Sequence, residues 1–125
     1  MAIEGLDHVT LLAGDLARSV AFYERALGLR SGDRPPFGFP GAWLYLGAVP
    51  VVHLIGGRGS ATGTGAIDHV AFRAAGLEAT RRRLAADGIA FEERMVPGLG
   101  LHQVFVRDPD GVKIELNFAA AEASP

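Results

Sequence analysis

The pattern of apolar residues predicts a strand and then a helix at the start of this chain. Residues 6–13 form a short apolar run with His8, Thr10 and Leu12 on one face by strand alternation. A helix follows, because apolar residues recur at helical spacing at Leu16, Val20, Tyr23 and Leu27. Asp15 is the predicted N-cap, since its carboxylate can accept from the free amides of the first turn, and Gly28 is the predicted left-handed residue after the helix.

The rest of the pattern predicts two copies of one unit. Short apolar runs at 42–46 and 51–55 are separated by Gly, Ala, Val and Pro, which is typical of strands joined by a turn. The second half shows the same order, with a strand at 67–73, a helix at about 77–87 and strands at 89–95, 103–107 and 112–118. Each half is therefore predicted to be a βαβββ module.

A repeated motif places four polar side chains at equivalent positions. Leu6-Asp7-His8-Val9 returns as Ile67-Asp68-His69-Val70, a shift of 61 residues, and at that shift Trp43 falls on Val104. After a one-residue adjustment in a turn, the strand of His53 lies over the strand of Glu115. Four potential metal ligands therefore occupy two equivalent pairs of positions: His8, His69, His53 and Glu115.

Size and composition limit the organisation. The chain has 125 residues, 49% of them hydrophobic, and half of it is near the lower size limit for an independent core, so the modules are expected to share a core with each other or with a second chain. We place module 1 at about 4–56, a Gly-rich linker at 57–65, module 2 at about 66–118 and a flexible tail at 119–125. A linker is favoured over a phosphate-binding loop there, because no Gly-Lys-Ser/Thr follows and no helix starts at this point.

Charge and cysteine content exclude several classes of partner. A net charge of −2 without a basic stripe argues against nucleic acid. The absence of cysteine excludes disulfides, thiolate ligands and a cysteine nucleophile. No leader and no apolar stretch of ~20 residues is evident, so we expect a cytoplasmic protein without a membrane partner.

The motifs resemble those of the vicinal oxygen chelate superfamily, which includes glyoxalase I, extradiol dioxygenases, fosfomycin-resistance proteins, methylmalonyl-CoA epimerase and bleomycin-binding proteins. The resemblance covers almost the whole chain. It implies an α+β fold in which each βαβββ module forms half of an open barrel and two modules form a cup around one divalent metal ion. The matching segments are Leu6-Asp7-His8-Val9, Phe22-Tyr23, Leu27-Gly28, Ile67-Asp68-His69-Val70-Ala71-Phe72 and Phe105-Val106-Arg107-Asp108-Pro109-Asp110-Gly111 leading to Ile114-Glu115-Leu116.

The resemblance implies metal ligands at His8, His69 and Glu115. A lone histidine on a strand face is more often a hydrogen-bonded packing residue, but here the repeat, the strand phase and the glutamate agree. His53 falls at a position that holds Glu, Gln, His or a non-ligand in relatives, and it is either a fourth ligand or a base beside the metal. Such a mixed set does not distinguish Fe, Mn, Ni, Co and Zn.

Other residues are assigned to the substrate or to structure. Residues expected to line the cup and contact substrate are Trp43, Tyr45, Phe37, Phe39, Phe105, Arg107 and His102, with Phe37 and Phe39 in a lid and His102 in a loop or at the rim. Asp108 to Gly111 fits a type I turn that delivers Glu115 in register. The three arginines 81–83 fit a solvated helix face.

The leading functional hypothesis is a metal-dependent enzyme with glyoxalase-like lyase or isomerase chemistry on a small substrate with two adjacent oxygens, and with Glu115 or His53 as the base. His53 replaces the carboxylate usual in glyoxalase I, which argues against the ordinary form of that activity. An iron(II) ring-cleaving dioxygenase is the alternative enzyme, although Phe105 stands where those relatives carry a tyrosine. A bleomycin-resistance-like binding protein is the alternative without catalysis. Relatives of this size imply a homodimer with exchanged modules and sites shared between chains.

Overall fold

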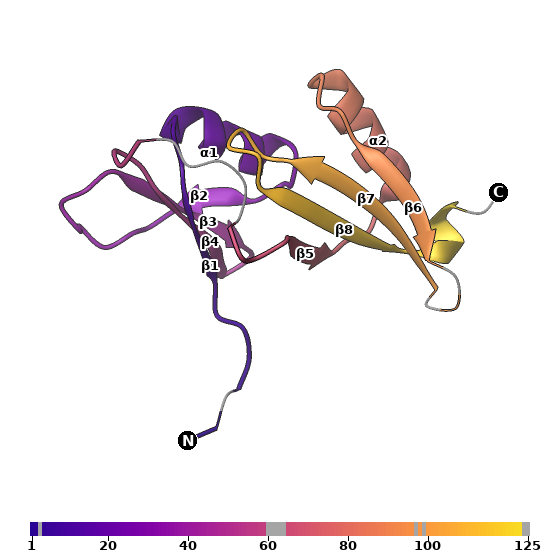
Figure 1. The fold of residues 1–125 in the computed structure, drawn as a ribbon, viewed down its shortest axis with the longest axis horizontal. Helices are drawn as coiled ribbons and strands as arrows, with labels where there is room; N and C mark the ends of the chain where they lie inside the picture. Colours follow the sequence, from indigo (N-terminus) through magenta and orange to yellow (C-terminus); the bar gives the residue numbers. More distant parts are fainter. Residues whose placement is uncertain (3, 60–64, 97, 99, 124–125) are drawn as a thin grey trace. The chain divides into compact units, whose positions relative to one another are not determined.

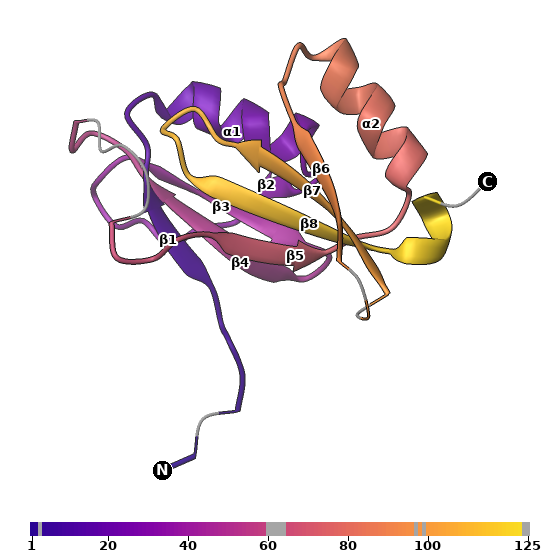
Figure 2. The same cartoon turned by 45° about the vertical axis from the view of Figure 1, so that its right-hand side comes forward.

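The computed structural model describes residues 1–2, 4–59, 65–96, 98 and 100–123. The chain divides into two compact units, Met1–Ala61 and Thr62–Pro125. The boundary falls in the predicted linker, of which residues 60–64 lie outside the described residues. In Figures 1 and 2 each helix lies along one face of the sheet in its own unit.

The first unit has the predicted βαβββ order. Its sheet has the strand order β1-β4-β3-β2, in which β1 and β4 are parallel and the other pairs antiparallel. The apolar pattern did not show β2, because its three residues are all exposed. The elements are β1 (Val9–Leu12), α1 (Leu16–Arg25), β2 (Arg30–Gly32), β3 (Gly41–Leu46) and β4 (Val49–Ile55).

The second unit repeats this topology. Its sheet has the order β5-β8-β7-β6, in which β5 and β8 are parallel and the other pairs antiparallel, so the two tandem βαβββ modules are confirmed. Its elements are β5 (Val70–Arg73), α2 (Leu77–Ala86), β6 (Glu92–Val96), β7 (Leu101–Arg107), β8 (Lys113–Ala119) and the 3₁₀ helix η1 (Ala120–Ala123). The segment predicted as a flexible tail contains η1, and residues 124–125 lie outside the described residues.

Alternation along the central strands decides which side chains form the core. In β4, Val52 and Leu54 are buried and the intervening His53 is half-buried. In β8, Ile114 and Leu116 are buried and the intervening Glu115 is half-buried. Each fully buried aliphatic side chain stabilises the fold by about 1.5–3 kcal/mol. The same alternation therefore builds the core and leaves His53 and Glu115 on the opposite face of each sheet.

The two helices begin differently. Asp15 caps α1 as predicted, because its Oδ1 accepts from the Arg18 amide at 3.1 Å. The N-cap of α2 is Gly76, at φ 85°, and makes no side-chain cap. The amides of Gly76 and Leu77 instead donate to Oε1 of Glu122 in η1, each at 3.0 Å. A residue 45 positions further along the chain thus supplies the cap of α2.

The predicted turn before β8 is confirmed. The Gly111 amide donates to the Asp108 carbonyl at 3.0 Å. The buried Asp108 carboxylate also accepts from the amides of Asp110 and Val112, each at 2.9 Å. This acidic side chain therefore fixes the turn that leads into the strand of Glu115. Across the described residues, neither α-helix is long and apolar enough to cross a membrane.

Candidate functional site

Strand register makes His53 and Glu115 equivalent. Thr10 lies opposite His53 in the first unit, and Ala71 lies opposite Glu115 in the second. Because His8 and His69 each precede these partners by two residues, the predicted equivalence of the two pairs holds in the register.

The aromatic partners require one correction. Trp43 pairs with His53 and Phe105 pairs with Glu115, so Trp43 corresponds to Phe105, and its predicted match with Val104 is wrong. The one-residue adjustment falls earlier than we expected, before β3 and β7.

Three rings form a stack in the first unit. The His8 and His53 ring centres are 3.8 Å apart, and those of Trp43 and His53 are 4.0 Å apart, with an interplanar angle of 12° in each case. Two of the predicted ligands thus lie together, and Trp43 is stacked on His53 as well.

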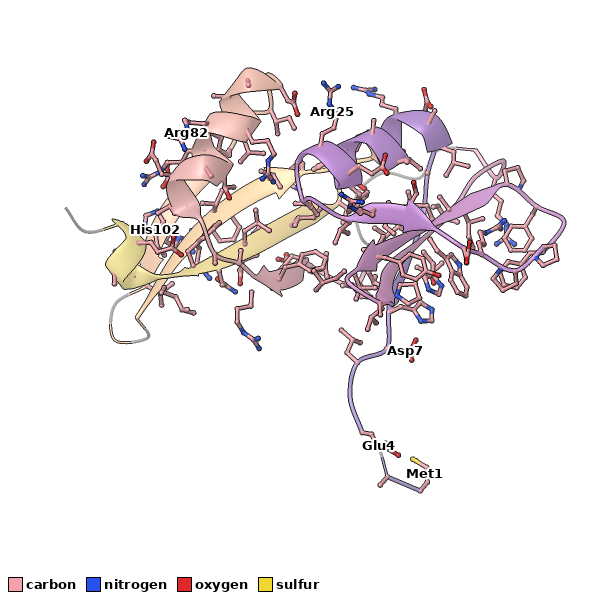
Figure 3. All side chains as sticks on the ribbon, turned by 180° about the vertical axis from the view of Figure 1, so that it is seen from behind. Met1, Glu4, Asp7, Arg25, Arg82 and His102 are labelled. Atoms are coloured by element: carbon pink, nitrogen blue, oxygen red, sulfur yellow. The ribbon has the colours of Figure 1, made fainter. Side chains whose placement is uncertain are left out.

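The aspartate before each repeated histidine fixes its tautomer. His8 Nδ1 lies 2.7 Å from Asp7 Oδ1, and His69 Nδ1 lies 2.9 Å from Asp68 Oδ2. An ionised carboxylate only accepts hydrogen bonds, so each Nδ1 carries a proton, and in the neutral form of the ring the lone pair is on Nε2. Carboxylates hold metal-binding histidines in this way. Asp7 lies just before β1 (Figure 3).

His69 and Glu115 form the second pair. His69 Nε2 is 3.6 Å from Glu115 Oε1, beyond hydrogen-bond length, and Glu115 Oε2 accepts from Asn117 Nδ2 at 2.9 Å. Two ligand atoms that bind one zinc-sized ion at a tetrahedral angle are about 3.4 Å apart. The spacing and the chemistry of this pair therefore suit a shared divalent cation.

His53 is held as a neutral imidazole. Its Nε2 lies 3.1 Å from the Pro50 carbonyl oxygen, which can only accept, so Nε2 carries the proton and Nδ1 has the free lone pair. Burial, and then the neighbouring His8, lower the pKa of His53 from 6.5, and these effects outweigh the carbonyl bond, which raises it. At neutral pH the side chain therefore offers Nδ1 to a proton or a metal.

Within each unit the structure brings two of the four predicted ligands together, His8 with His53 in the first unit and His69 with Glu115 in the second. Among the residues that the structure describes, no group of three or more His, Cys, Asp or Glu side chains could hold a metal ion. One pair lies in each unit.

Of the residues predicted to contact substrate, Phe37 and Tyr45 in the first unit contact other parts of the same unit. Phe37 packs against Phe39 at 5.4 Å and against Trp43 at 6.2 Å between ring centres. Tyr45 donates its hydroxyl to the Asp33 carbonyl at 2.6 Å.

In the second unit, Phe105 lies beside two cations. The Lys113 ammonium is 5.0 Å and the Arg94 guanidinium 5.7 Å from its ring centre. Arg107 donates to the Gly111 carbonyl at 3.1 Å and so braces the turn before β8.

The loop or rim position predicted for His102 is wrong. His102 lies in β7 with 9% of its surface exposed, and alternation places it on the sheet face opposite that of Phe105. Its Nε2 is 2.6 Å from Glu93 Oε1, which also accepts from Arg81 at 2.7 Å. The Arg81 bond, and secondarily the bond to His102, lower the pKa of Glu93. Figure 3 shows His102 on the side of α2 and Arg82.

Sequence reasoning missed three groups of residues. Asp7 and Asp68 were read only as part of the repeated motif, although an acid next to each candidate ligand was the available signal. Arg34, which contacts both Phe37 and Phe39, was not singled out. The bond from Asn117 to Glu115 needed the alternation of β8 to become visible.

Comparison with known proteins identifies the family. The model of the Glyoxalase/Bleomycin resistance protein/Dioxygenase superfamily matches residues 5–116, and the chain belongs to this superfamily. Lactoylglutathione lyase of Salmonella typhimurium is 33% identical over 119 residues, which cover 87% of this chain and 88% of the relative. Glyoxylase I 4 of Arabidopsis thaliana is 28% identical over 91% of this chain and 70% of its own length.

Solved structures share the fold. The fosfomycin resistance protein FosX of Listeria monocytogenes superposes with a TM-score of 0.76 at 20% identity, covering 97% of this chain and 98% of that one. A glyoxylase/bleomycin resistance protein/dioxygenase domain from Frankia sp. EAN1pec gives a TM-score of 0.78 at 23% identity, with 94% and 93% covered. These similarities establish the architecture of the chain.

Proposed function

We propose that this protein is a divalent-metal-dependent enzyme that carries out glyoxalase-like lyase or isomerase chemistry on a small substrate with adjacent oxygen atoms. His8, His69 and Glu115 are the proposed protein ligands. The observation that carries the proposal is the spacing of 3.6 Å between His69 Nε2 and Glu115 Oε1, with no proton-sharing contact between them. Superfamily membership and the similarity to lactoylglutathione lyase support the glyoxalase-like reaction class.

The proposed site assigns separate roles to the bound metal ion, to Asp7 and Asp68, and to His53. A bound divalent cation supplies a Lewis acid that stabilises negative charge on substrate oxygens. Asp7 and Asp68 keep the Nε2 lone pairs of their histidines available. We propose His53 as the base: it is neutral, it can take a substrate proton on Nδ1, and the Pro50 carbonyl at its Nε2–H stabilises the imidazolium that forms.

The first test is metal binding. We expect purified protein to bind one divalent ion per chain by calorimetry, and expect His8→Ala and Glu115→Gln to abolish high-affinity binding because each removes a proposed ligand. Glu92→Gln is the matched control, since Glu92 is an exposed carboxylate on β6 of the same sheet. Unchanged metal affinity in both ligand variants would refute the proposal and leave a binding protein without catalysis.

The second test separates reaction types. Metal-loaded protein is assayed for isomerisation of hemithioacetals to thioesters and, after anaerobic iron loading, for oxygen consumption with a catechol panel. We expect the first activity, and we expect His53→Gln to lower kcat more than metal affinity if His53 is the base. Oxygen consumption without isomerisation would assign the dioxygenase reaction instead.

The proposal includes a homodimer with sites shared between chains, His8 and His53 from one chain and His69 and Glu115 from the other. A mixture of His8→Ala and Glu115→Gln chains tests this sharing. In a shared-site dimer each mixed pair regains one intact site, so random mixing restores about a quarter of the wild-type sites. Absence of recovery, with chain exchange shown by mass spectrometry, would place each site within one chain.

A further inference from the structure

Four side chains of the first unit, three of them exposed and Arg34 half-buried, form a group that the metal chemistry does not use. We call Arg34, Phe37, Phe39 and Arg58 the arginine–phenylalanine cluster. The Arg34 guanidinium lies 5.0 Å from the centre of each phenyl ring, and Arg58 lies 5.6 Å from that of Phe39. Phe37 is 47% and Phe39 37% exposed. Two aromatic rings and two cations are thus presented at the surface rather than buried in a core.

The segment that carries the cluster is held in one conformation by its own contacts. Arg34 Nη2 donates to the Phe39 carbonyl at 2.9 Å, and the Gly56 amide donates to the Pro40 carbonyl at 2.9 Å. At Gly41 a Cβ would lie 2.6 Å from the Leu54 carbonyl oxygen and 2.7 Å from Arg34 Nη2, so the close approach of Arg34 requires glycine there. A fixed arrangement lowers the entropy cost of binding a ligand.

Ring contacts connect the cluster to the imidazoles. Phe37 lies 6.2 Å from Trp43, Trp43 lies 4.0 Å from His53, and His53 lies 3.8 Å from His8. All of these rings belong to the first unit. A ligand that stacks on the phenyl rings is therefore close to the side chains proposed for chemistry.

We propose that the arginine–phenylalanine cluster binds the non-reacting part of the substrate, and that this part is a planar aromatic group bearing a carboxylate. Aromatic faces favour stacking with a second ring, and guanidinium groups with remaining N–H donors favour carboxylates. The two arginines make this surface locally cationic although the chain has a net charge of −2. The assignment to substrate rests on the proposed function, whereas binding of an aromatic anion does not require the metal.

The test uses three probes with EDTA present: 2-naphthoate, 2-naphthalenemethanol and cyclohexanecarboxylate. Affinity is measured by calorimetry, and the site is located by the indole N–H resonance, which is a single signal because Trp43 is the only tryptophan. We expect 2-naphthoate to bind about tenfold more tightly than either other probe, since each of them lacks one of the two interactions. The indole resonance is expected to shift on binding.

Variants separate the two interactions. Arg34→Gln is expected to remove most of the preference for the anion, and the double variant Phe37→Leu/Phe39→Leu most of the preference for the aromatic ring. Arg18→Gln is the matched control, because Arg18 is an exposed arginine on α1, and it is expected to leave all three affinities unchanged.

Each outcome decides the proposal. Equal affinity for the three probes, or variants that lower the melting temperature while both preferences persist, would show that the cluster only anchors its loop and would overturn the inference. Loss of metal binding by itself would refute the proposed function but not this site, since the probes are tested without metal. Metal binding without selective binding of 2-naphthoate would refute this site alone.

Discussion

Replacing Asp108 is expected to destabilise the second unit and to weaken metal binding through Glu115. Its carboxylate accepts from the amides of Asp110 and Val112, and Val112 is only 4% exposed. Asp108→Ala leaves the Val112 N–H buried without this acceptor, which costs about 1–3 kcal/mol. The Asp110 amide is nearer to solvent and can bond to water, so it adds about 1 kcal/mol or less.

The total for Asp108→Ala is therefore about 1–4 kcal/mol, and Asp108→Asn, which keeps one acceptor oxygen, should cost about 1 kcal/mol. For a chain of this size about 3 kcal/mol lowers the melting temperature by roughly 10 °C. Because the turn sets the register in which Phe105 faces Glu115, we also expect the alanine variant to bind metal more weakly than the asparagine variant.

Calorimetric melting of metal-free protein measures the first effect, and metal titration of the folded variants measures the second. Glu92→Gln, an exposed change on β6, serves as control and should alter stability by less than about 0.5 kcal/mol. If Asp108→Ala melts within a degree or two of the wild type, the two backbone bonds do not hold this turn and the reasoning fails.

Three further predictions concern the cap of α2 by Glu122, the orientation of His69 by Asp68, and the contacts of Glu93 with Arg81 and His102. Glu122→Ala should destabilise α2 by about 1 kcal/mol and Glu122→Gln by less, seen as faster hydrogen exchange at Leu77, and equal exchange in all three proteins would contradict the cap. Asp68→Asn should weaken metal binding about tenfold in a chelator competition. This is the lower end of the effect expected for a residue that hydrogen-bonds a metal ligand, because the Asp68 side chain is largely exposed. An unchanged metal affinity would show that Asp68 does not orient His69. The pKa of Glu93 is lowered from 4.5, so its contribution to the free energy of unfolding is present above pH 4.5 and is lost as the pH falls below that value. In urea unfolding, the free energy of unfolding of Glu93→Gln should therefore fall less in acid than that of the wild type. Equal pH dependence of the two proteins would count against the interaction of Glu93 with Arg81 and His102.

The repeated βαβββ order could be predicted because each module is locally consistent. Apolar alternation marked the central strands, and Asp15 and Gly28 marked the ends of α1. The exposed β2 escaped because it buries no side chain that would leave a pattern. The cap of α2 escaped because its acceptor is distant in sequence, and no local motif at Gly76 indicates it.

The candidate site was predictable only as far as symmetry extends. The equivalence of His8 with His69 and of His53 with Glu115 followed from the repeat, and the strand register agrees with it. His102 was misplaced because its surroundings depend on Glu93 and Arg81, which reach it from another strand and a helix. The tautomer of His53 is set by its hydrogen bond to the Pro50 carbonyl oxygen. That contact depends on the local backbone geometry, which the sequence alone does not show.

The equivalence of His53 and Glu115 has a consequence for how such a protein diversifies after duplication. Two identical halves would bring either two carboxylates or two neutral imidazoles at this strand position, whereas the present pair brings one formal negative charge. In the site we propose, a dication held by these donors would retain an excess charge of +1 with which to attract an anionic ligand. A substitution at this one strand position, in one half only, is thus enough to change the net charge of the proposed metal site without altering the scaffold.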